Sequence, residues 1–243
     1  MRRELVLLNG WGMTQAVWQP MVAALPDDYV VHRIDLHELA PHGDAGIEDF
    51  AVAAAGRAPA HCSVVGWSLG AQIALQWAHD SPAQVGRLVL IAATPCFVAR
   101  SDWPAGMEPS VFDDFADDVQ RDASGALARF ALLQARGDEN MSAVARALRA
   151  AVCRDTGDSQ RALRAGLECL RRADLRARTG SVTPPAYLIH GAHDALVPLA
   201  AAERLRSDMP QARLGVMPRA GHAPHVSEPA AVAASIVEFL NEQ

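Results

Sequence analysis

Seven residues, Val64-Val65-Gly66-Trp67-Ser68-Leu69-Gly70, constrain the fold of this chain more than any other stretch. An apolar, β-branched run leads into them, and a helical pattern of apolar positions follows at residues 72–79. Glycines on both sides of Ser68 allow a sharp turn that exposes the serine hydroxyl, as in the G-x-S-x-G nucleophile elbow. In that interpretation the amide of Leu69, at the start of the helix, can donate to an oxyanion. The alternative is an ordinary strand-to-helix turn in which Ser68 is the helix N-cap.

Short apolar runs alternate with helical patterns along most of the chain. This alternation predicts an α/β fold with a mostly parallel central sheet and helices on both faces. We predict strands at residues 5–8, 29–34, 61–65, 87–91, 187–190 and 212–216, helices at residues 17–25, 47–58, 72–79, 200–207 and 229–240, and a polar loop at residues 37–46.

The alternation stops after residue 97 and resumes with the strand predicted at residues 187–190. Four helical patterns fill the interval, at residues 111–119, 123–134, 142–152 and 159–170, and no convincing strand pattern lies among them. Most of their apolar residues must pack helix against helix. A helical insertion at this point is also how such folds build a cover over a catalytic serine. We therefore expect residues 1–96 and 181–243 to form the core and residues 97–180 to form an inserted helical segment, called the lid below.

A serine, an acid and a histidine follow one another in the order Ser68, Asp194, His222. Each lies in a loop after a predicted strand, and in a parallel sheet such loops open at one edge. Neutral His222 can take the Ser68 proton, and Asp194 can orient the imidazole. This order is typical of an α/β-hydrolase triad.

The other histidines near this site allow different interpretations. His190 and His193 flank Asp194, which could indicate a metal site, but no third ligand stands at a suitable spacing, so we expect no metal. His225 is expected to pack or to face solvent. The glycine loop at residues 9–13 precedes the elbow, where such a loop supplies a second oxyanion amide, here from Trp11. The alternative is a plain turn in which Trp11 only packs.

The bulk composition excludes several classes of protein. Half of the 243 residues are hydrophobic, which is enough for one α/β domain and excludes a disordered chain. A formal net charge of −6 argues against nucleic-acid binding, and the apolar runs are too short to cross a membrane. Four widely spaced cysteines favour reduced thiols in the cytoplasm over a disulfide framework or a zinc site.

Several stretches of sequence distinguish one protein family from another better than the triad does. They read LVLLNGWG at residues 5–12, GWSLG at 66–70, TPCFVARSDWP at 94–104, RFALLQ at 129–134 and GHAP at 221–224. With them the chain resembles the α/β-hydrolases, and more narrowly the pimeloyl-[acyl-carrier protein] methyl ester esterases of biotin synthesis, over nearly its whole length. Asn9 departs from this family, which usually has histidine there.

The resemblance implies a serine carboxylesterase that needs no cofactor. It would cleave the methyl ester of pimeloyl-[acyl-carrier protein], releasing methanol and ending elongation of the acyl chain. The family's oxyanion donors would be the amides of Trp11 and Leu69. Its substrate-binding positions correspond to Trp11, Ser68, Leu69, Phe130, Ala131, Leu132, Leu133, Gln134 and His222, with residues 130–134 lining the acyl channel.

The same resemblance implies an acyl-carrier protein as partner. Arg129 and Arg146 match two of the family's carrier-contacting arginines. Residues 129–178 hold eleven arginines and six acidic residues, so this window carries +5 and the rest of the chain −11. A basic lid on an acidic body suits an acidic carrier, although surface arginines can also serve only to hydrate helices.

Two other functions remain open at this point. A short-chain carboxylesterase, a lactonase or a carbon–carbon bond hydrolase would use the same fold and triad on small substrates, because specificity lies in the lid pocket. A receptor with a hydrolase-like pocket would bind a small ligand without turnover, but the intact order of serine, acid and histidine argues against it.

Overall fold

A six-stranded sheet forms the centre of the computed structural model, which describes residues 3–39, 46–153 and 157–242. The strand order is β2-β1-β3-β4-β5-β6, and every neighbouring pair is parallel. The strands are β1 (Arg3–Leu8), β2 (Tyr29–Ile34), β3 (Cys62–Trp67), β4 (Val85–Ile91), β5 (Ala186–Gly191) and β6 (Ala212–Met217). All six predicted strands are present, so the predicted α/β fold is confirmed.

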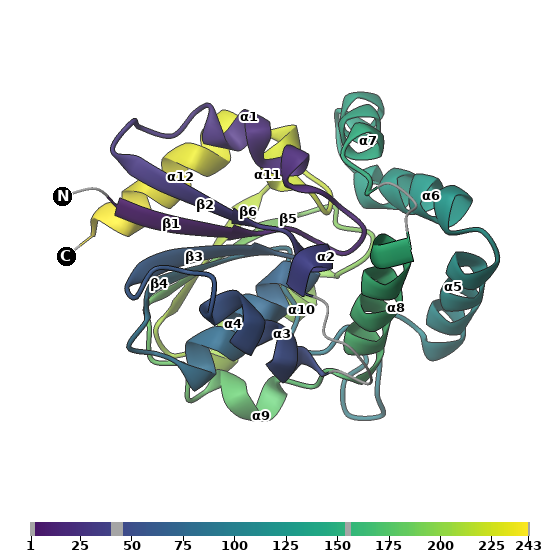
Figure 1. Ribbon diagram of the computed structural model, residues 1–243, viewed down its shortest axis with the longest axis horizontal. Helices are drawn as coiled ribbons and strands as arrows, with labels where there is room; N and C mark the ends of the chain where they lie inside the picture. The colour runs from purple at the N-terminus through teal and green to yellow at the C-terminus, as the bar shows by residue number, and fades with distance from the viewer. Residues whose placement is uncertain (1–2, 40–45, 154–156, 243) are drawn as a thin grey trace.

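Helices cover both faces of the sheet (Figure 1). They are the 3₁₀ helix η1 (Gln15–Trp18), α1 (Gln19–Val22), α2 (Leu36–Leu39), α3 (Ile47–Ala55), α4 (Leu69–Asp80), α5 (Pro109–Arg121), α6 (Ala123–Ala135), α7 (Met141–Ala150), α8 (Gly157–Arg172), α9 (Arg176–Thr179), α10 (Leu199–Asp208), α11 (Pro224–Ser227) and α12 (Pro229–Asn241). Helices α1, α11 and α12 pack together on one face, and α3, α4, α9 and α10 cover the other. From β1 the chain first adds β2 on one side and then returns to add β3 on the other, so the strand order switches between β1 and β3. Open parallel sheets bind their ligands at the carboxyl ends of the strands beside such a switch point.

The hydrophobic core lies in two layers, one on each face of the sheet. In β1, Val6 and Leu8 join the cluster that contains α3 and α4, whereas Leu5 and Leu7 join the cluster that contains α1 and α12. All four side chains are fully buried. Because both faces of a parallel sheet are covered, its strands appear in the sequence as continuous apolar runs, and this made them predictable.

The structure differs from the prediction in two short segments. Residues 17–25, predicted as one helix, form η1 followed by the short α1. Pro20 lies in the first turn of α1, where a residue without an amide hydrogen starts a helix more easily than it continues one. Helix α2 (Leu36–Leu39) includes the first three residues of the predicted loop at 37–46, and its two leucines are buried. Helix α2 packs against α3 and α8, so tertiary contacts override the polar local sequence, and residues 40–45 lie outside the described ones.

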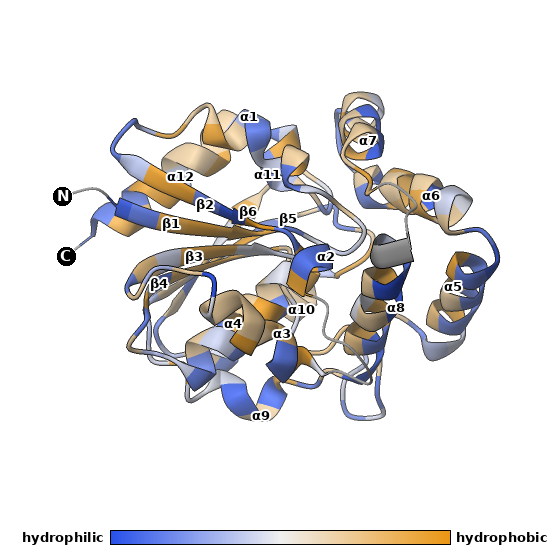
Figure 2. Cartoon of the chain, in the orientation of Figure 1, coloured by the Kyte–Doolittle hydropathy of each residue, from blue (hydrophilic) through white to orange (hydrophobic). Residues whose placement is uncertain are grey.

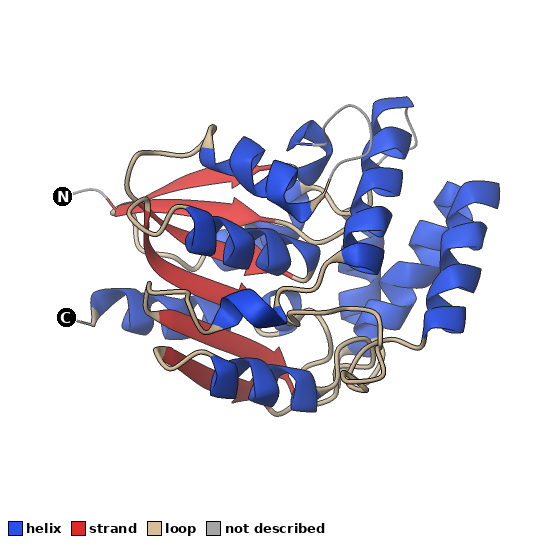
Figure 3. Cartoon of the chain, turned by 90° about the horizontal axis from the view of Figure 1, so that it is seen from below, coloured by secondary structure: helices blue, strands red, loops and turns tan. Residues whose placement is uncertain are grey.

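The four helices predicted for the lid are present as α5, α6, α7 and α8. They lie beyond the carboxyl ends of the strands, at the end of the molecule away from both chain termini (Figures 1 and 3). Helices α5 and α7 show hydrophilic and hydrophobic sides in Figure 2. In α5 the buried residues are Phe112, Ala116 and Val119, which lie on one stripe of an amphipathic helix.

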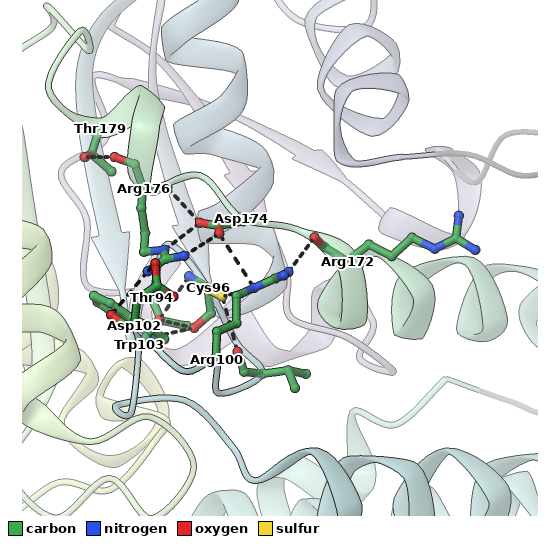
Figure 4. A network of polar contacts seen from close by, with 10 residues as sticks. Thr94, Cys96, Arg100, Asp102, Trp103, Arg172, Asp174, Arg176 and Thr179 are labelled. Atoms are coloured by element: carbon green, nitrogen blue, oxygen red, sulfur yellow. Dashed lines mark hydrogen bonds and ion pairs between the residues drawn. The ribbon is translucent and has the colours of Figure 1, made fainter.

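The two ends of the lid meet in one polar network, which we call the lid joint (residues 94–103 and 172–179; Figure 4). The Leu175 amide donates to the Pro95 carbonyl at 2.8 Å, and Cys96 pairs with Asp174 in an isolated antiparallel bridge. The indole of Trp103 donates to the Cys96 carbonyl at 2.9 Å. The conspicuous stretch at residues 94–104 therefore attaches the lid to the core.

Charged groups complete the lid joint around Asp174. Arg176 donates to both Asp174 oxygens, from Nε at 2.8 Å and from Nη2 at 2.7 Å, and Arg100 Nε lies 3.6 Å from Asp174 Oδ2. Hydrogen bonding to Arg176 lowers the pKa of the Asp174 carboxyl from its usual value, against the effect of burial. Arg176 also pairs with Asp102 at 2.9 Å. Both ends of the lid are thus held by one carboxylate between two arginines.

Within the described part of the chain, the helices include none that combines the length and the apolar character needed to cross a bilayer.

Candidate active site

Ser68 lies between β3 and α4 in a backbone conformation that is rare for a residue with a side chain. Its φ is 56° and its ψ is −118°. A Cβ on Gly66 would lie 2.4 Å from the Gly70 carbonyl oxygen, and a Cβ on Gly70 would lie 2.3 Å from the Leu8 carbonyl oxygen. Glycine at both positions therefore allows the close approach of β1, β3 and α4 that the strained turn requires. The turn presents Ser68 at the carboxyl edge of the sheet.

Loops after β3, β5 and β6 bring Ser68, Asp194 and His222 together. His222 Nε2 lies 3.0 Å from Ser68 Oγ, and His222 Nδ1 lies 2.7 Å from Asp194 Oδ2. The side chains of His222 and Asp194 are 1% and 0% exposed. With Nδ1–H donating to the carboxylate, Nε2 is left to accept the serine proton.

The Asp194 carboxylate is held in its charged form by its surroundings. Oδ1 accepts the backbone amides of Leu196 at 2.8 Å and Val197 at 2.9 Å, while Oδ2 faces His222. Burial alone would raise the pKa of Asp194. His222, His190 and the Val197 amide together outweigh burial, so the pKa of Asp194 lies below its usual value.

His190 is a neighbour of this carboxylate that sequence reasoning weighed only as a metal ligand. Its Nε2–H donates to the Val197 carbonyl at 2.9 Å, and the same nitrogen lies 3.5 Å from Asp194 Oδ2. Burial lowers the pKa of His190, which keeps its ring neutral. His193, the other histidine considered as a metal ligand, is exposed. Among the described residues, neither histidine belongs to a cluster of three potential metal ligands. His190 therefore braces the turn that carries Asp194.

The loop after β1 brings Trp11 to the same edge of the sheet. Gly12, with a φ of +72°, turns the loop back. Buried Asn9 accepts a hydrogen bond from Gln15 Nε2 at 2.8 Å and donates to the Met13 carbonyl. The asparagine at the family's usual histidine position thus fixes the shape of this loop.

The Trp11 side chain packs against the lid. Its indole Nε1–H donates to the Leu163 carbonyl of α8 at 2.8 Å, and its ring makes edge contacts with Phe115 and Phe130 at centroid distances of 5.4 and 5.3 Å. A Cβ on Gly166 would lie 2.7 Å from Trp11 Cδ1, so a glycine lets α8 reach the indole. The packing role considered for Trp11 applies to its side chain and does not involve its main-chain amide.

The five residues implied to line an acyl channel do not share one face of α6. Phe130 faces Trp11, whereas Ala131 is buried in the cluster on the other face of the sheet, and Leu132 is 42% exposed. The Gln134 carbonyl accepts the His222 amide at 3.2 Å. Leu133 is half-buried against the same cluster as Phe130. Successive residues of a helix turn by about 100°, so these five residues face different directions, and their role in binding an acyl chain stays a prediction.

Helix α8 borders a small cavity on its core side and a groove on its lid side. A cavity of about 20 Å³ is bounded by Trp11, Leu69, Leu163 and Gly166, among others, and has room for about one water molecule. A groove of about 380 Å³ runs between α5 and α8 and also includes Leu163 in its wall. Helix α8 thus separates the groove from the residues beside Ser68.

Trp67 and His225 form a buried aromatic layer beneath the histidine. The Trp67 indole Nε1–H donates to the His222 carbonyl at 2.8 Å. His225 is fully buried, with its ring 4.5 Å from that of Trp18 and 4.6 Å from that of Trp67. His225 therefore packs rather than facing solvent. The sequence placed Trp67 beside Ser68 but gave no signal for the direction of its indole.

The two arginines expected to contact a carrier lie on the outer side of the lid. Arg129, on α6, is 58% exposed and pairs with Asp118 of α5 at 3.1 Å. Arg146 is exposed on α7. Neither contacts the Ser68 site.

Comparison with known proteins places this geometry in a family. Residues 5–235 match the model of the alpha/beta hydrolase family. The chain is 39% identical over 229 residues to a pimeloyl-[acyl-carrier protein] methyl ester esterase of Nitrosomonas europaea, covering 93% of this chain and 91% of the relative. It is 42% identical over 235 residues to an esterase of the same name from Aromatoleum aromaticum, covering 94% of each.

A solved structure agrees in fold. The enol-lactonase of Burkholderia xenovorans superposes with a TM-score of 0.84 at 23% identity, covering 100% of this chain and 92% of that one. Since the family model matches residues 5–235 and the relatives cover 93% and 94% of the chain, the chain belongs to the alpha/beta hydrolase family.

Proposed function

We propose that this chain is a serine carboxylesterase that hydrolyses the methyl ester of pimeloyl-[acyl-carrier protein] to pimeloyl-[acyl-carrier protein] and methanol, a step of biotin synthesis. The observation that carries the proposal is the hydrogen-bonded line from Ser68 Oγ through His222 to Asp194, at 3.0 and 2.7 Å. The substrate is inferred from relatives of that name at 39% and 42% identity.

In the proposed reaction Ser68 Oγ attacks the ester carbonyl while His222 Nε2 takes its proton. The tetrahedral intermediate collapses as His222 returns that proton to the leaving methoxide, which departs as methanol. Water then attacks the acyl-serine, again losing a proton to His222, and the acid is released as the proton returns to Ser68. Asp194 keeps the imidazole oriented and stabilises its charged form throughout. The reaction needs no cofactor and no metal.

The negative oxygen of each intermediate needs hydrogen-bond donors. We assign these to the backbone amides of Leu69 and Trp11. Leu69 begins α4, whose first amides have no partner within the helix and whose dipole favours negative charge. Trp11 lies in the neighbouring loop, fixed by Asn9 and by contact with α8. Losing one such donor typically costs about 10²–10³ in kcat.

The partner in this proposal is the acyl-carrier protein, recognised by charge. The lid window is basic while the rest of the chain is acidic. Arg129 and Arg146 are both exposed, on neighbouring helices that pack together. A cytoplasmic location fits the four cysteines, none of which takes part in a disulfide bond.

A direct comparison of substrates tests the proposal. The kcat/KM of the purified chain is measured for the methyl ester of pimeloyl-[acyl-carrier protein] and for p-nitrophenyl acetate. We expect a strong preference for the carrier-bound ester. Cleavage of the small ester alone would remove the pathway and the carrier and leave a short-chain esterase, and failure to react with a fluorophosphonate would indicate a receptor.

Two sets of variants separate chemistry from docking. Ser68→Ala is expected to lower kcat by at least about 10³-fold and to leave the circular dichroism spectrum unchanged. Arg129→Glu with Arg146→Glu should raise KM for the carrier-bound ester only. Arg206→Glu, at an exposed position on α10 of the core, is a charge-reversal control away from the lid and should leave both esters unaffected. Unchanged turnover of the carrier-bound ester in the double variant would refute the docking site.

A further inference from the structure

The lid contacts the loop that carries His222 through its main chain. We call residues 218–223 the histidine loop and residues 135–139, between α6 and α7, the brace turn. The His222 amide donates to the Gln134 carbonyl, the last turn of α6, at 3.2 Å. The Glu139 amide donates to the Arg219 carbonyl at 3.0 Å. Two main-chain bonds thus join the lid to the histidine loop.

A buried carboxylate in the brace turn adds a third contact. Asp138 is only 6% exposed. Its Oδ2 accepts the Gly221 amide at 3.1 Å, and its Oδ1 accepts the Asn140 amide at 2.7 Å. Hydrogen bonds to an ionised acceptor are about twice as strong as neutral ones. The residue next to His222 is therefore held by a charge-assisted bond from the lid.

Glycines allow the brace turn to lie this close. Gly137 has a φ of +87°, and a Cβ on it would lie 2.2 Å from the carbonyl oxygen of His193, in the loop that carries Asp194. A Cβ on Gly221 would lie 3.0 Å from the carbonyl oxygen of Arg136. The brace turn therefore touches the acid loop and the histidine loop together.

The core and the lid both bind the His222 backbone. Its carbonyl is bound by the Trp67 indole of the core, and its amide by Gln134 of the lid. The hydrogen bond from the Gly221 amide to Asp138 further limits movement of the histidine loop. We propose that Asp138 is a positioning residue, which acts from the lid through Gly221 to keep the His222 imidazole within reach of Ser68. This rests on the proposed use of Ser68 and His222 in ester hydrolysis.

Positioning and substrate binding predict different kinetics. A lid residue that binds the acyl chain or the carrier affects KM, and only for the large ester. A residue that positions His222 lowers kcat for every ester, because the imidazole takes part in each turnover. A shift of about 1 Å in a catalytic group can cost about 10²-fold.

The test uses the full chain with p-nitrophenyl acetate and with the carrier-bound methyl ester. Asp138→Ala removes both acceptors. Asp138→Asn keeps one carbonyl oxygen but turns an NH₂ group toward the other amide, so it retains at most one of the two bonds. Asp122→Ala is the matched control, because Asp122 Oδ1 accepts the Gly125 amide at 2.9 Å at the other end of α6.

We expect Asp138→Ala to lower kcat for both esters by about 10- to 100-fold with KM within about twofold. Asp138→Asn should show a smaller loss of kcat in both assays. Asp122→Ala should lower the melting temperature without changing kcat, which separates loss of stability from loss of positioning.

Three results would overturn the proposal. They are a folded Asp138→Ala with kcat above half of the wild-type value, an effect on KM of the large ester alone, and an equal loss of kcat in Asp122→Ala. If Asp138→Ala does not fold, the kcat of Asp138→Asn decides by the same criteria. A wild-type chain without turnover of either ester, or Ser68→Ala with full turnover, would instead refute the proposed function.

Discussion

His225 makes the stability of this protein sensitive to mild acid. The ring is fully buried between Trp18 and Trp67, and neither of its nitrogens has a hydrogen-bond partner among the described residues. Burial, and to a lesser degree the nearby His222, lowers the pKa of His225 from 6.5 to about 3. The unfolded chain therefore takes up a proton near pH 6.5, whereas the folded chain takes it up only near pH 3.

The size of the effect follows from these two values. Above pH 6.5 both states hold neutral His225, and its contribution to stability does not change with pH. As the pH falls below 6.5 the unfolded state gains a proton that the folded state does not bind. Between pH 7.5 and pH 5, His225 alone should lower the free energy of unfolding by about 2 kcal/mol. With a urea m-value of about 2–3 kcal/mol/M, the midpoint should fall by roughly 0.7–1 M.

The assay is urea unfolding followed by circular dichroism at several pH values, with the cysteines kept reduced. His225→Leu removes the titrating group at similar volume, and any packing cost is constant with pH. The wild type should therefore lose about 2 kcal/mol more than the variant between pH 7.5 and pH 5. His61→Leu, at an exposed position, should follow the wild type. Parallel losses in the wild type and His225→Leu would show that folded His225 is protonated or hydrated, and the reasoning would fail.

Two further substitutions probe the elbow and the lid joint. Gly70→Ala should cost at least about 3 kcal/mol and abolish esterase activity, because a Cβ would lie 2.3 Å from the Leu8 carbonyl oxygen. Gly86→Ala, whose Cβ would meet its nearest atom at 3.7 Å, is the control, and urea unfolding compares the two. Asp174→Asn should lower stability by about 1.5 kcal/mol, because it leaves the arginines of the joint without a full anion. A melting temperature roughly 3–6 °C lower is expected, and a shift below 1 °C would mean that Arg176 finds equal partners elsewhere.

The core of the site was predictable because it depends on local patterns and on sheet topology. Each strand of a covered parallel sheet is a short apolar run, and the residue that follows it must lie at the carboxyl edge. Ser68, Asp194 and His222 each follow such a run. We could therefore predict that these three residues lie close together from the strand assignments alone, without knowing the full strand order.

What the sequence could not provide were directions of side chains on helices and turns. Leu132 resembles a channel residue by its place in RFALLQ but points outward, because α6 turns its successive residues about the helix axis. Helix α2 was not predicted because its local sequence is polar, and contacts with α3 and α8 stabilise it. Asp138 follows a glycine in a short turn, where an acid usually faces solvent. Its burial depends on the distant Gly221, and nothing within the sequence near residue 138 indicates that contact.

The lid is held to the catalytic edge at more than its two ends. The lid joint fixes where it leaves and rejoins the core, the Trp11 indole is bound to α8, and the brace turn is bound to the histidine loop. The second and third contacts involve the residues that we assign to the oxyanion and to the general base. A movement of α8 would break its hydrogen bond to Trp11, whereas a movement of the brace turn would break the bonds between the lid and the histidine loop. The histidine loop is thus held by α6 and the brace turn, whereas the loop that carries Trp11 is held by α8.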